Sequence, residues 1–190
     1  MSAGVYECIE GTWAAVGVVW LTGTLVSKQT ARREPTSSRL LHIAIIAAVF
    51  ALPFSARLHV GQLARRFVPD SPVIARTGLA LTAAGCAFAI WARLLLGGNW
   101  SSSVTVKQDH RLIRRGPYAI VRHPIYSGFL LGLLGTALAL GELRGIVALA
   151  LAGIGWHVKS RREEAFMTAE FGAEYTRYQR EVKALIPFVL

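Results

Sequence analysis

The sequence predicts an all-α integral membrane protein with five transmembrane helices in a single domain. Three observations support this prediction. Apolar residues make up 53% of the 190 residues and charged residues only 17%, whereas an ordinary soluble domain has about 25% charged residues. Five apolar runs approach the roughly 20 residues that a helix needs to cross a bilayer. Lysine and arginine are concentrated in alternate connections between these runs.

The apolar runs define the five expected helices. They are Thr12 to Val26, Leu40 to Ala56, Val73 to Leu96, Ile125 to Leu140 and Gly145 to Val158. Pro53 is expected to kink or end the second helix. The last two runs are short for full spans and are joined by four residues, 141–144, which predicts a C-terminal helical hairpin. Gly128, Gly132 and Gly135 line one face of the fourth helix, and small residues let another helix approach closely.

Basic residues predict the orientation. With an outside N-terminus, the inside segments 27–39, 97–124 and 159–190 hold fifteen lysines and arginines, whereas the outside segments hold four. Cytoplasmic loops carry such an excess, so we expect the C-terminus in the cytosol. Three of the four outside residues, Arg57, Arg65 and Arg66, lie in the second connection. The formal charge of +10 then reflects topology and attraction to anionic lipids, and nucleic acid is not expected as a partner.

Several other functions lack their sequence signals. Cys8 and Cys86 build neither a disulfide framework nor a C-x-x-C motif. The N-terminus lacks the basic region and cleavage site of a secretory signal peptide. No dinucleotide, P-loop, zinc-protease or serine-hydrolase motif is present. His110 and His123 have no third ligand at a suitable spacing, so we expect no metal, and His42, His59 and His157 are interpreted as packing or interface residues.

Two polar stretches are predicted on the same side of the membrane, at the two ends of the hairpin. In the first, Gly116-Pro117 indicates a turn, and His123-Pro124 suits a helix start. The second, residues 159–190, has an amphipathic helical pattern, and the part after Phe171 suits a helix on the membrane surface. Because the hairpin returns to the surface that it leaves, Arg122 to Pro124 are expected near Lys159 to Glu164.

Several short motifs follow one another around the hairpin: Gly116-Pro117-Tyr118, Arg122-His123-Pro124-Ile125-Tyr126, the hairpin itself, Glu163-Glu164, Phe171-Gly172 and the Tyr175/Tyr178 pair. Together they resemble the isoprenylcysteine carboxyl methyltransferase family, and membrane phospholipid N-methyltransferases share the arrangement. The resemblance covers about residues 93–188 and is to a short, prokaryotic-type member, so it implies a location in the cytoplasmic (inner) membrane. It divides the chain into a two-helix scaffold, 1–72, and a catalytic half, 73–190. That half comprises the third helix, a cofactor loop at 97–124, the hairpin 125–158 and a C-terminal helix.

The resemblance implies an enzyme that binds S-adenosylmethionine without a Rossmann domain and methylates a lipophilic small molecule from the bilayer. It implies no obligate protein partner. Glu163 corresponds to an acid that faces the methyl acceptor. The positions that correspond to the cofactor site are His110, Leu112, Ile113, Tyr118, His123, Pro124, Ile125, Tyr126 and Glu164.

One position departs from the prenylcysteine pattern. Lys159 stands four residues before Glu163, where those enzymes have an arginine, and a lysine cannot grip a carboxylate bidentately. A carboxylate acceptor would be held by Lys159 or by Arg93, an ionisable residue inside the third span. An amine acceptor would use Glu163 as its base or acid partner. A carboxylate is the expected acceptor and a lipid amine the runner-up. The two other functions considered are a sterol-reductase-type enzyme that binds NADPH and a noncatalytic lipid-binding protein.

Overall fold

The structure, a computed structural model, describes residues 3–24, 30–33, 36–97, 105–107, 112–187 and 189. It is helical at all five predicted positions. The helices are α1 (Ala3–Thr24), α2 (Thr36–Phe54), α3 (Pro72–Leu96), α4 (Pro124–Leu140), α5 (Leu143–Phe171) and α6 (Ala173–Glu181). Pro53 lies next to the last residue of α2, so it ends this helix as expected. Among the described residues, α3 alone is both long and apolar enough to cross a membrane, and 40–54 and 124–140 are shorter apolar helices. Five crossings therefore remain a prediction.

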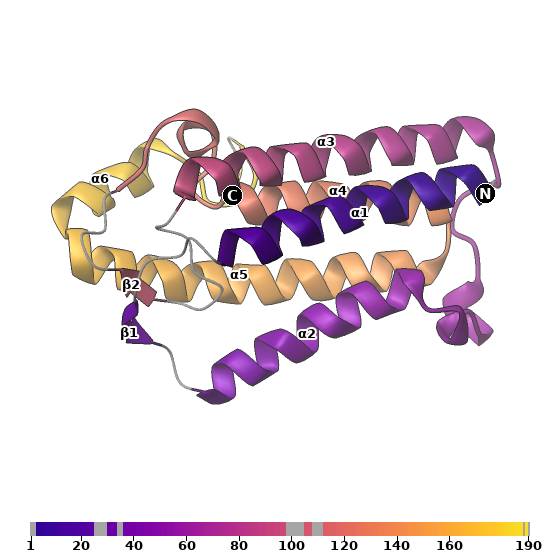
Figure 1. Cartoon of the computed structure of the whole chain (residues 1–190), viewed down its shortest axis with the longest axis horizontal. Coiled ribbons are helices and arrows are strands. Elements are labelled where there is room, and N and C mark those ends of the chain that lie inside the picture. The colour runs from indigo at the N-terminus through magenta and orange to yellow at the C-terminus, as the bar shows by residue number, and fades with distance from the viewer. Residues whose placement is uncertain are drawn as a thin grey trace.

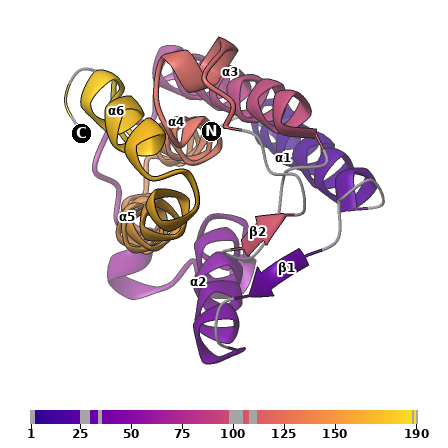
Figure 2. The ribbon, with the colours of Figure 1, turned by 90° about the vertical axis from the view of Figure 1, so that its left-hand side faces the viewer.

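The five long helices run alternately up and down, so their ends gather in two groups (Figure 1). One group, here called the polar end, contains the last turns of α1, α3 and α5, the first turns of α2 and α4, and α6. A short antiparallel pair of strands, β1 (Thr30–Arg33) and β2 (Thr105–Lys107), also lies there. The described parts of the three basic segments predicted to share one side therefore meet at this end, as Figure 2 shows from the polar end.

Helices α3 and α4 pack with their backbones in close contact because both present glycines. A Cβ atom added at Gly85 would lie 2.4 Å from the backbone nitrogen of Gly132 and 2.5 Å from the carbonyl oxygen of Gly128. One added at Gly135 would lie 2.4 Å from the backbone nitrogen of Thr82. Real Cβ atoms do not come that close, so only glycine fits at these crossings. The small-residue face predicted on the fourth helix is confirmed.

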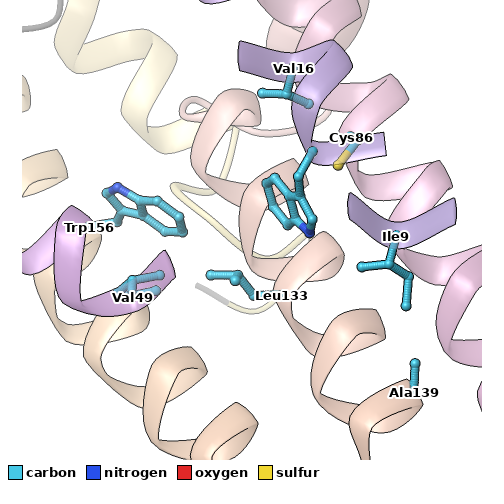
Figure 3. Close-up of a cluster of buried hydrophobic side chains, with 9 residues drawn as sticks. Ile9, Val16, Val49, Cys86, Leu133, Ala139 and Trp156 are labelled. Atoms are coloured by element: carbon cyan, nitrogen blue, oxygen red, sulfur yellow. The ribbon is translucent and has the colours of Figure 1, made fainter. Parts of the chain in front are cut away.

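The core lies where α1, α2 and α5 close around α3 and α4. Buried side chains from four helices meet there: Ile9 and Val16 of α1, Val49 of α2, Leu133 of α4 and Trp156 of α5 (Figure 3). A short polar chain crosses this core: the indole nitrogen of Trp13 donates to the Thr136 hydroxyl at 3.0 Å, and that hydroxyl lies 3.3 Å from the hydroxyl of Thr82. Buried polar groups require such partners, so this chain fixes how α1, α3 and α4 lie against one another.

The opposite end is closed by hydrogen bonds between the connection 55–71 and the turn of the hairpin. The Leu143 amide donates to the Arg65 carbonyl at 2.9 Å. Arg144 pairs with Glu142 at 2.7 Å, and Arg66 donates to the Leu140 carbonyl at 3.2 Å. Two of the four basic residues in the predicted outside segments thus have structural partners. These contacts hold the hairpin turn in place, so both arms reach the polar end in register.

The single C-terminal helix expected over 159–190 is wrong. Helix α5 continues through Phe171 and ends at Gly172, which has a positive φ of 54°, a backbone conformation that glycine adopts readily. Helix α6 then turns back, and Tyr175 and Tyr178 are buried against the protein rather than lying on a membrane surface. Residues 183–185 follow α6. Their carbonyl groups accept hydrogen bonds from Arg122 and His123, which precede α4, and from Ser127 in its first turn.

Candidate active site

The polar end of the hairpin brings two of the sequence motifs, Arg122-His123-Pro124 and Glu163-Glu164, into direct contact. Helix α4 begins at Pro124, directly after His123, which suits a proline because the first helical N–H has no partner in the helix. Glu163 and Glu164 lie on the last third of α5. The His123 ring lies between them, with Nε2 3.1 Å from Glu164 and Nδ1 3.5 Å from Glu163. The closure predicted from the hairpin is confirmed.

Arg122 and Glu164 form a buried ion pair beside this histidine. The Arg122 guanidinium lies 2.7 Å from the Glu164 carboxylate, and both side chains are less than a tenth exposed. Gln179 on α6 donates to the same carboxylate at 3.2 Å. Burial alone would raise the pKa of Glu164, but hydrogen bonds from His123 and Arg122 and their positive charges lower it to about 2. Glu164 is therefore a fixed anion that joins α4, α5 and α6.

Glu163 is held by a different set of partners. The Tyr126 hydroxyl, one turn into α4, donates to it at 2.7 Å. Burial raises the pKa of Glu163, but the hydrogen bond from His123 and the charge of Lys159 outweigh this effect and lower it below its ordinary value. Burial likewise lowers the pKa of His123, whereas its hydrogen bonds to Glu163 and Glu164 raise it. When the ring is protonated, both of its nitrogens donate, which matches its position between two acids.

An aromatic stack extends this cluster toward the core. The rings of His123 and Tyr126 are nearly parallel, with centroids 5.7 Å apart, and Tyr126 stacks on Trp156 at 5.8 Å. The Lys159 ammonium lies 6.0 Å from the centroid of the Tyr126 ring. Lys159, Trp156 and Glu163 all come from α5, at spacings of three and four residues that place them on one helix face. A cation, an anion and flat rings therefore lie side by side.

A residue from α2 joins the site, and no sequence pattern predicts its presence there. The Lys159 ammonium lies 3.1 Å from Nε2 of His42, a residue that the sequence places only in packing or at an interface. The lysine is 8% exposed. No periodicity or motif links residues 42 and 159, because their contact depends on how α2 packs against α5. His59 has an interface partner at the other end, Glu142, at 3.0 Å.

Arg93 is engaged by backbone at two helix ends. Its guanidinium donates to the Gly23 carbonyl at 2.8 Å and to the Gly97 carbonyl at 3.0 Å, and the residue is 2% exposed. The last carbonyls of a helix lack partners within the helix, and here α1 and α3 share one cation for them. The side chain thus ties the polar ends of α1 and α3 together.

The remaining predicted site residues surround the start of α4. Tyr118 is buried in the turn Gly116–Ala119, and its hydroxyl donates to the Ala92 carbonyl at 3.4 Å. Ile125 packs with Ala92 and Tyr118, and Ile113 packs against this cluster. Pro124 is fully buried, and Leu112 is partly buried. His110 lies outside the described residues. No group of three or more His, Cys, Asp or Glu side chains suited to a metal ion occurs in the described part of the chain.

Residues near the C-terminus contact the segment that carries Arg122 and His123. The backbone amides of Arg122 and His123 donate to the carbonyls of Lys183 and Ala184 at 2.8 Å and 2.9 Å, and Ser127 donates to the Leu185 carbonyl. The Tyr178 hydroxyl donates to the Tyr118 carbonyl, and Arg114 pairs with Glu181. These contacts, which the sequence did not predict, fix the peptide that carries Arg122 and His123.

Comparisons with known proteins identify the family of the chain. A sequence model of the phospholipid methyltransferase family matches residues 73–174, from the start of α3 to the start of α6. Two relatives are isoprenylcysteine O-methyltransferases. The protein from Schizosaccharomyces pombe is 36% identical over 103 residues, which is 52% of this chain and 43% of the relative. Protein B from Arabidopsis thaliana is 31% identical over 121 residues, or 61% and 60% of the two chains.

A solved structure shares the fold. The eukaryotic intramembrane Ras methyltransferase, isoprenylcysteine carboxyl methyltransferase, superposes with a TM-score of 0.53 at 24% identity, covering 82% of this chain and 54% of that one. The chain spans about half the length of the curated relatives it matches. The family match includes both hairpin motifs and covers more than half of the chain. The chain therefore belongs to the phospholipid methyltransferase family, and its resemblance to isoprenylcysteine carboxyl methyltransferases, predicted from the motifs, is confirmed.

Proposed function

We propose that the protein is an integral membrane methyltransferase that uses S-adenosylmethionine to methylate a lipophilic carboxylate. The observation that carries this proposal is the contact of His123 and Tyr126 with Glu163 and Glu164, which joins the two motifs of the family in one cluster. We further propose that the polar end faces the cytosol, which supplies the cofactor, and that the acceptor arrives sideways from the bilayer.

The chemistry of the cluster fits the cofactor. S-adenosylmethionine carries a positive sulfonium and an ammonium group, and when bound it supplies an electrophilic methyl group. The buried carboxylate of Glu164, the partly buried carboxylate of Glu163 and a stack of aromatic rings complement such a cation. We propose that Tyr118, His123, Pro124, Ile125, Tyr126 and Glu164, together with His110, Leu112 and Ile113, form its site. The roles of the chain are to orient the reactants and exclude water, and no covalent protein nucleophile is required.

Lys159 supports a carboxylate as the acceptor. Its ammonium is largely withdrawn from solvent, close to Tyr126 and on the same helix face as Glu163. A buried cation attracts an anion and repels a second cation, so it favours an acidic headgroup over a protonated amine. Arg93 was the other candidate for this role. Because its guanidinium already donates to two helix-end carbonyls, we favour Lys159.

A lipid amine is the second candidate acceptor, favoured by Glu163. This acid accepts a hydrogen bond from Tyr126, and its charge is stabilised by His123 and Lys159. A carboxylate near the acceptor can take the proton that an amine loses on methylation. The low pKa of Glu163 makes it a weak base, however, which suits a carboxylate acceptor better because that acceptor loses no proton.

The experiment is transfer of radiolabelled methyl from S-adenosylmethionine to fractionated membrane lipids by the purified protein. The proposal predicts label in an acidic lipid fraction that is released by mild base, since methyl esters hydrolyse and methylamines do not. Base-stable label would identify an amine acceptor. Absence of transfer, together with tight binding of NADPH, would replace the proposal with the reductase-type function. Glu163→Gln serves as the matched variant with expected loss of turnover.

A further inference from the structure

We propose that His42 is a positioning residue that, through Lys159, makes the acceptor site selective for a carboxylate. This inference deepens the proposed function and rests on it. It extends the site to α2, which lies before the region matched by the family. The observation that carries it is the 3.1 Å contact between Nε2 of His42 and the Lys159 ammonium.

The hydrogen bond between these residues has a defined direction. An ammonium group donates and never accepts, so the imidazole Nε2 accepts and the His42 ring is neutral with its proton on Nδ1. The contact therefore leaves the positive charge on Lys159. Because a lysine side chain has four rotatable bonds, its ammonium is fixed in place only where such a partner holds it. His42 supplies that partner from a separate helix.

The location of the pair suits an acceptor that is apolar with one charged end. Lys159 is buried, whereas Leu40, Leu41 and Ile43, which flank His42 on α2, are 58–62% exposed. These apolar side chains on the outer surface of a membrane protein face lipid. The pair therefore lies just inside the lipid-facing surface. An acceptor with an apolar chain at this surface brings its carboxylate to the Lys159 ammonium.

Packing between α2 and α5 does not depend on His42 alone. Gly155 lies against Ile45, where an added Cβ would come within 3.1 Å of the isoleucine side chain, and Val49 and Trp156 share the core. These contacts hold the two helices together further from the polar end. A His42 variant should therefore fold, and its effect on the ligand can be measured separately from its effect on stability.

The test measures binding of S-farnesyl-3-mercaptopropionic acid and of its neutral carboxamide to the full chain in detergent. The wild-type protein should bind the acid more tightly than the amide. His42→Ala should weaken binding of the acid about tenfold, the usual effect of one lost hydrogen bond to a charged group, and leave the amide unchanged. His42→Gln places an oxygen near the position of Nε2 and should restore the preference. His42→Asn is shorter and should not.

His157→Ala is the matched control, because His157 is an exposed histidine two residues from Lys159. The His157→Ala protein should bind both probes as tightly as the wild type does. The proposal is overturned if His42→Ala binds the acid as tightly as the wild type does. Equal weakening of acid and amide would mean that His42 serves packing only, and no acid preference in the wild type would also contradict the proposal. Methyl transfer is assayed separately, so its absence would count against the proposed function without altering the binding result.

Discussion

His123 and Glu164 lie 41 residues apart in the sequence, yet the histidine Nε2 is 3.1 Å from the carboxylate. The contact joins the residue that directly precedes α4 to the C-terminal third of α5. It exists because the hairpin turn at the opposite end is fixed, so the two antiparallel arms return to one level. Arg122 and Gln179 bind the same carboxylate, and the site is thereby built around a single buried anion.

Loss of Arg122 should destabilise the fold strongly. Arg122→Gln removes the charge that compensates Glu164, and breaking a buried ion pair from one side costs about 3 kcal/mol or more. Arg161→Gln, at an exposed position on α5, should change the free energy of unfolding by less than about 0.5 kcal/mol. Reversible unfolding in mixed micelles, followed by tryptophan fluorescence, measures both. Equal stabilities for the two variants would show that the ion pair contributes nothing.

Stability should depend on pH with a defined sign. The pKa of Glu164 is lowered in the folded protein to about 2, so its contribution is present above its ordinary value of 4.5 and is lost as pH falls from there to about 2. The pKa of His123 is raised, so its contribution is present below about 6.5 and is lost as pH rises through the folded value. Melting temperature should therefore be highest between about pH 4.5 and 6.5.

Glu164 contributes to the acid limb of that profile together with Glu163, whose pKa is also lowered in the folded protein. Glu164→Gln should lower the melting temperature at pH 6 and reduce its further loss toward pH 2. Glu174→Gln, an exposed acid on α6, should keep the wild-type profile. If Glu164→Gln retains the full acid limb, another carboxylate is responsible.

The hydroxyl of Tyr126 should matter for turnover more than for folding. Tyr126→Phe keeps the ring that stacks on Trp156 but removes the 2.7 Å hydrogen bond to Glu163. Hydrogen bonds to charged groups contribute about 1.5–3 kcal/mol, so methyl transfer should fall at least about tenfold. Tyr6→Phe, at the opposite end, removes a hydroxyl that donates to the Phe54 carbonyl and should leave turnover unchanged. Full activity in Tyr126→Phe would remove this contact from the mechanism.

The crossing of α3 and α4 should tolerate no added methyl group. Gly85→Ala would place Cβ 2.4 Å from the Gly132 nitrogen, so the helices must separate, at a cost of about 3 kcal/mol. Turnover should fall as well, because α4 carries Tyr126. Gly17→Ala on α1 meets nothing within 4 Å and should leave stability unchanged or raise it by up to about 1 kcal/mol. Thermal unfolding of both variants provides the comparison, and a stable Gly85→Ala protein would contradict the close crossing.

Local patterns predicted the helices and the closure of the hairpin. Apolar runs predicted the five long helices, Gly116-Pro117 predicted the turn, and His123-Pro124 predicted the start of α4. Each of these signals lies in one local stretch of the sequence. The contact of His123 with the two acids followed from the antiparallel arms alone.

Contacts between distant segments could not be predicted in the same way. His42 meets Lys159 only because of how α2 packs against α5, and Arg93 meets Gly23 because α1 ends beside α3. The bonds of residues 183–185 to the start of α4 involve backbone groups, which leave no trace in residue type. The expected C-terminal helix failed at Gly172, where the amphipathic pattern continues but the backbone turns.

Binding of S-adenosylhomocysteine to the purified protein in detergent, measured by calorimetry, tests whether the hairpin cluster is the methyl-donor site. We expect the wild type and Gly17→Ala to bind it. His123→Ala and Tyr126→Ala, each checked for helix content by circular dichroism, should bind it at least about tenfold more weakly. Unchanged affinity in both folded site variants would contradict this assignment, because the hairpin cluster would then not be where the methyl donor binds.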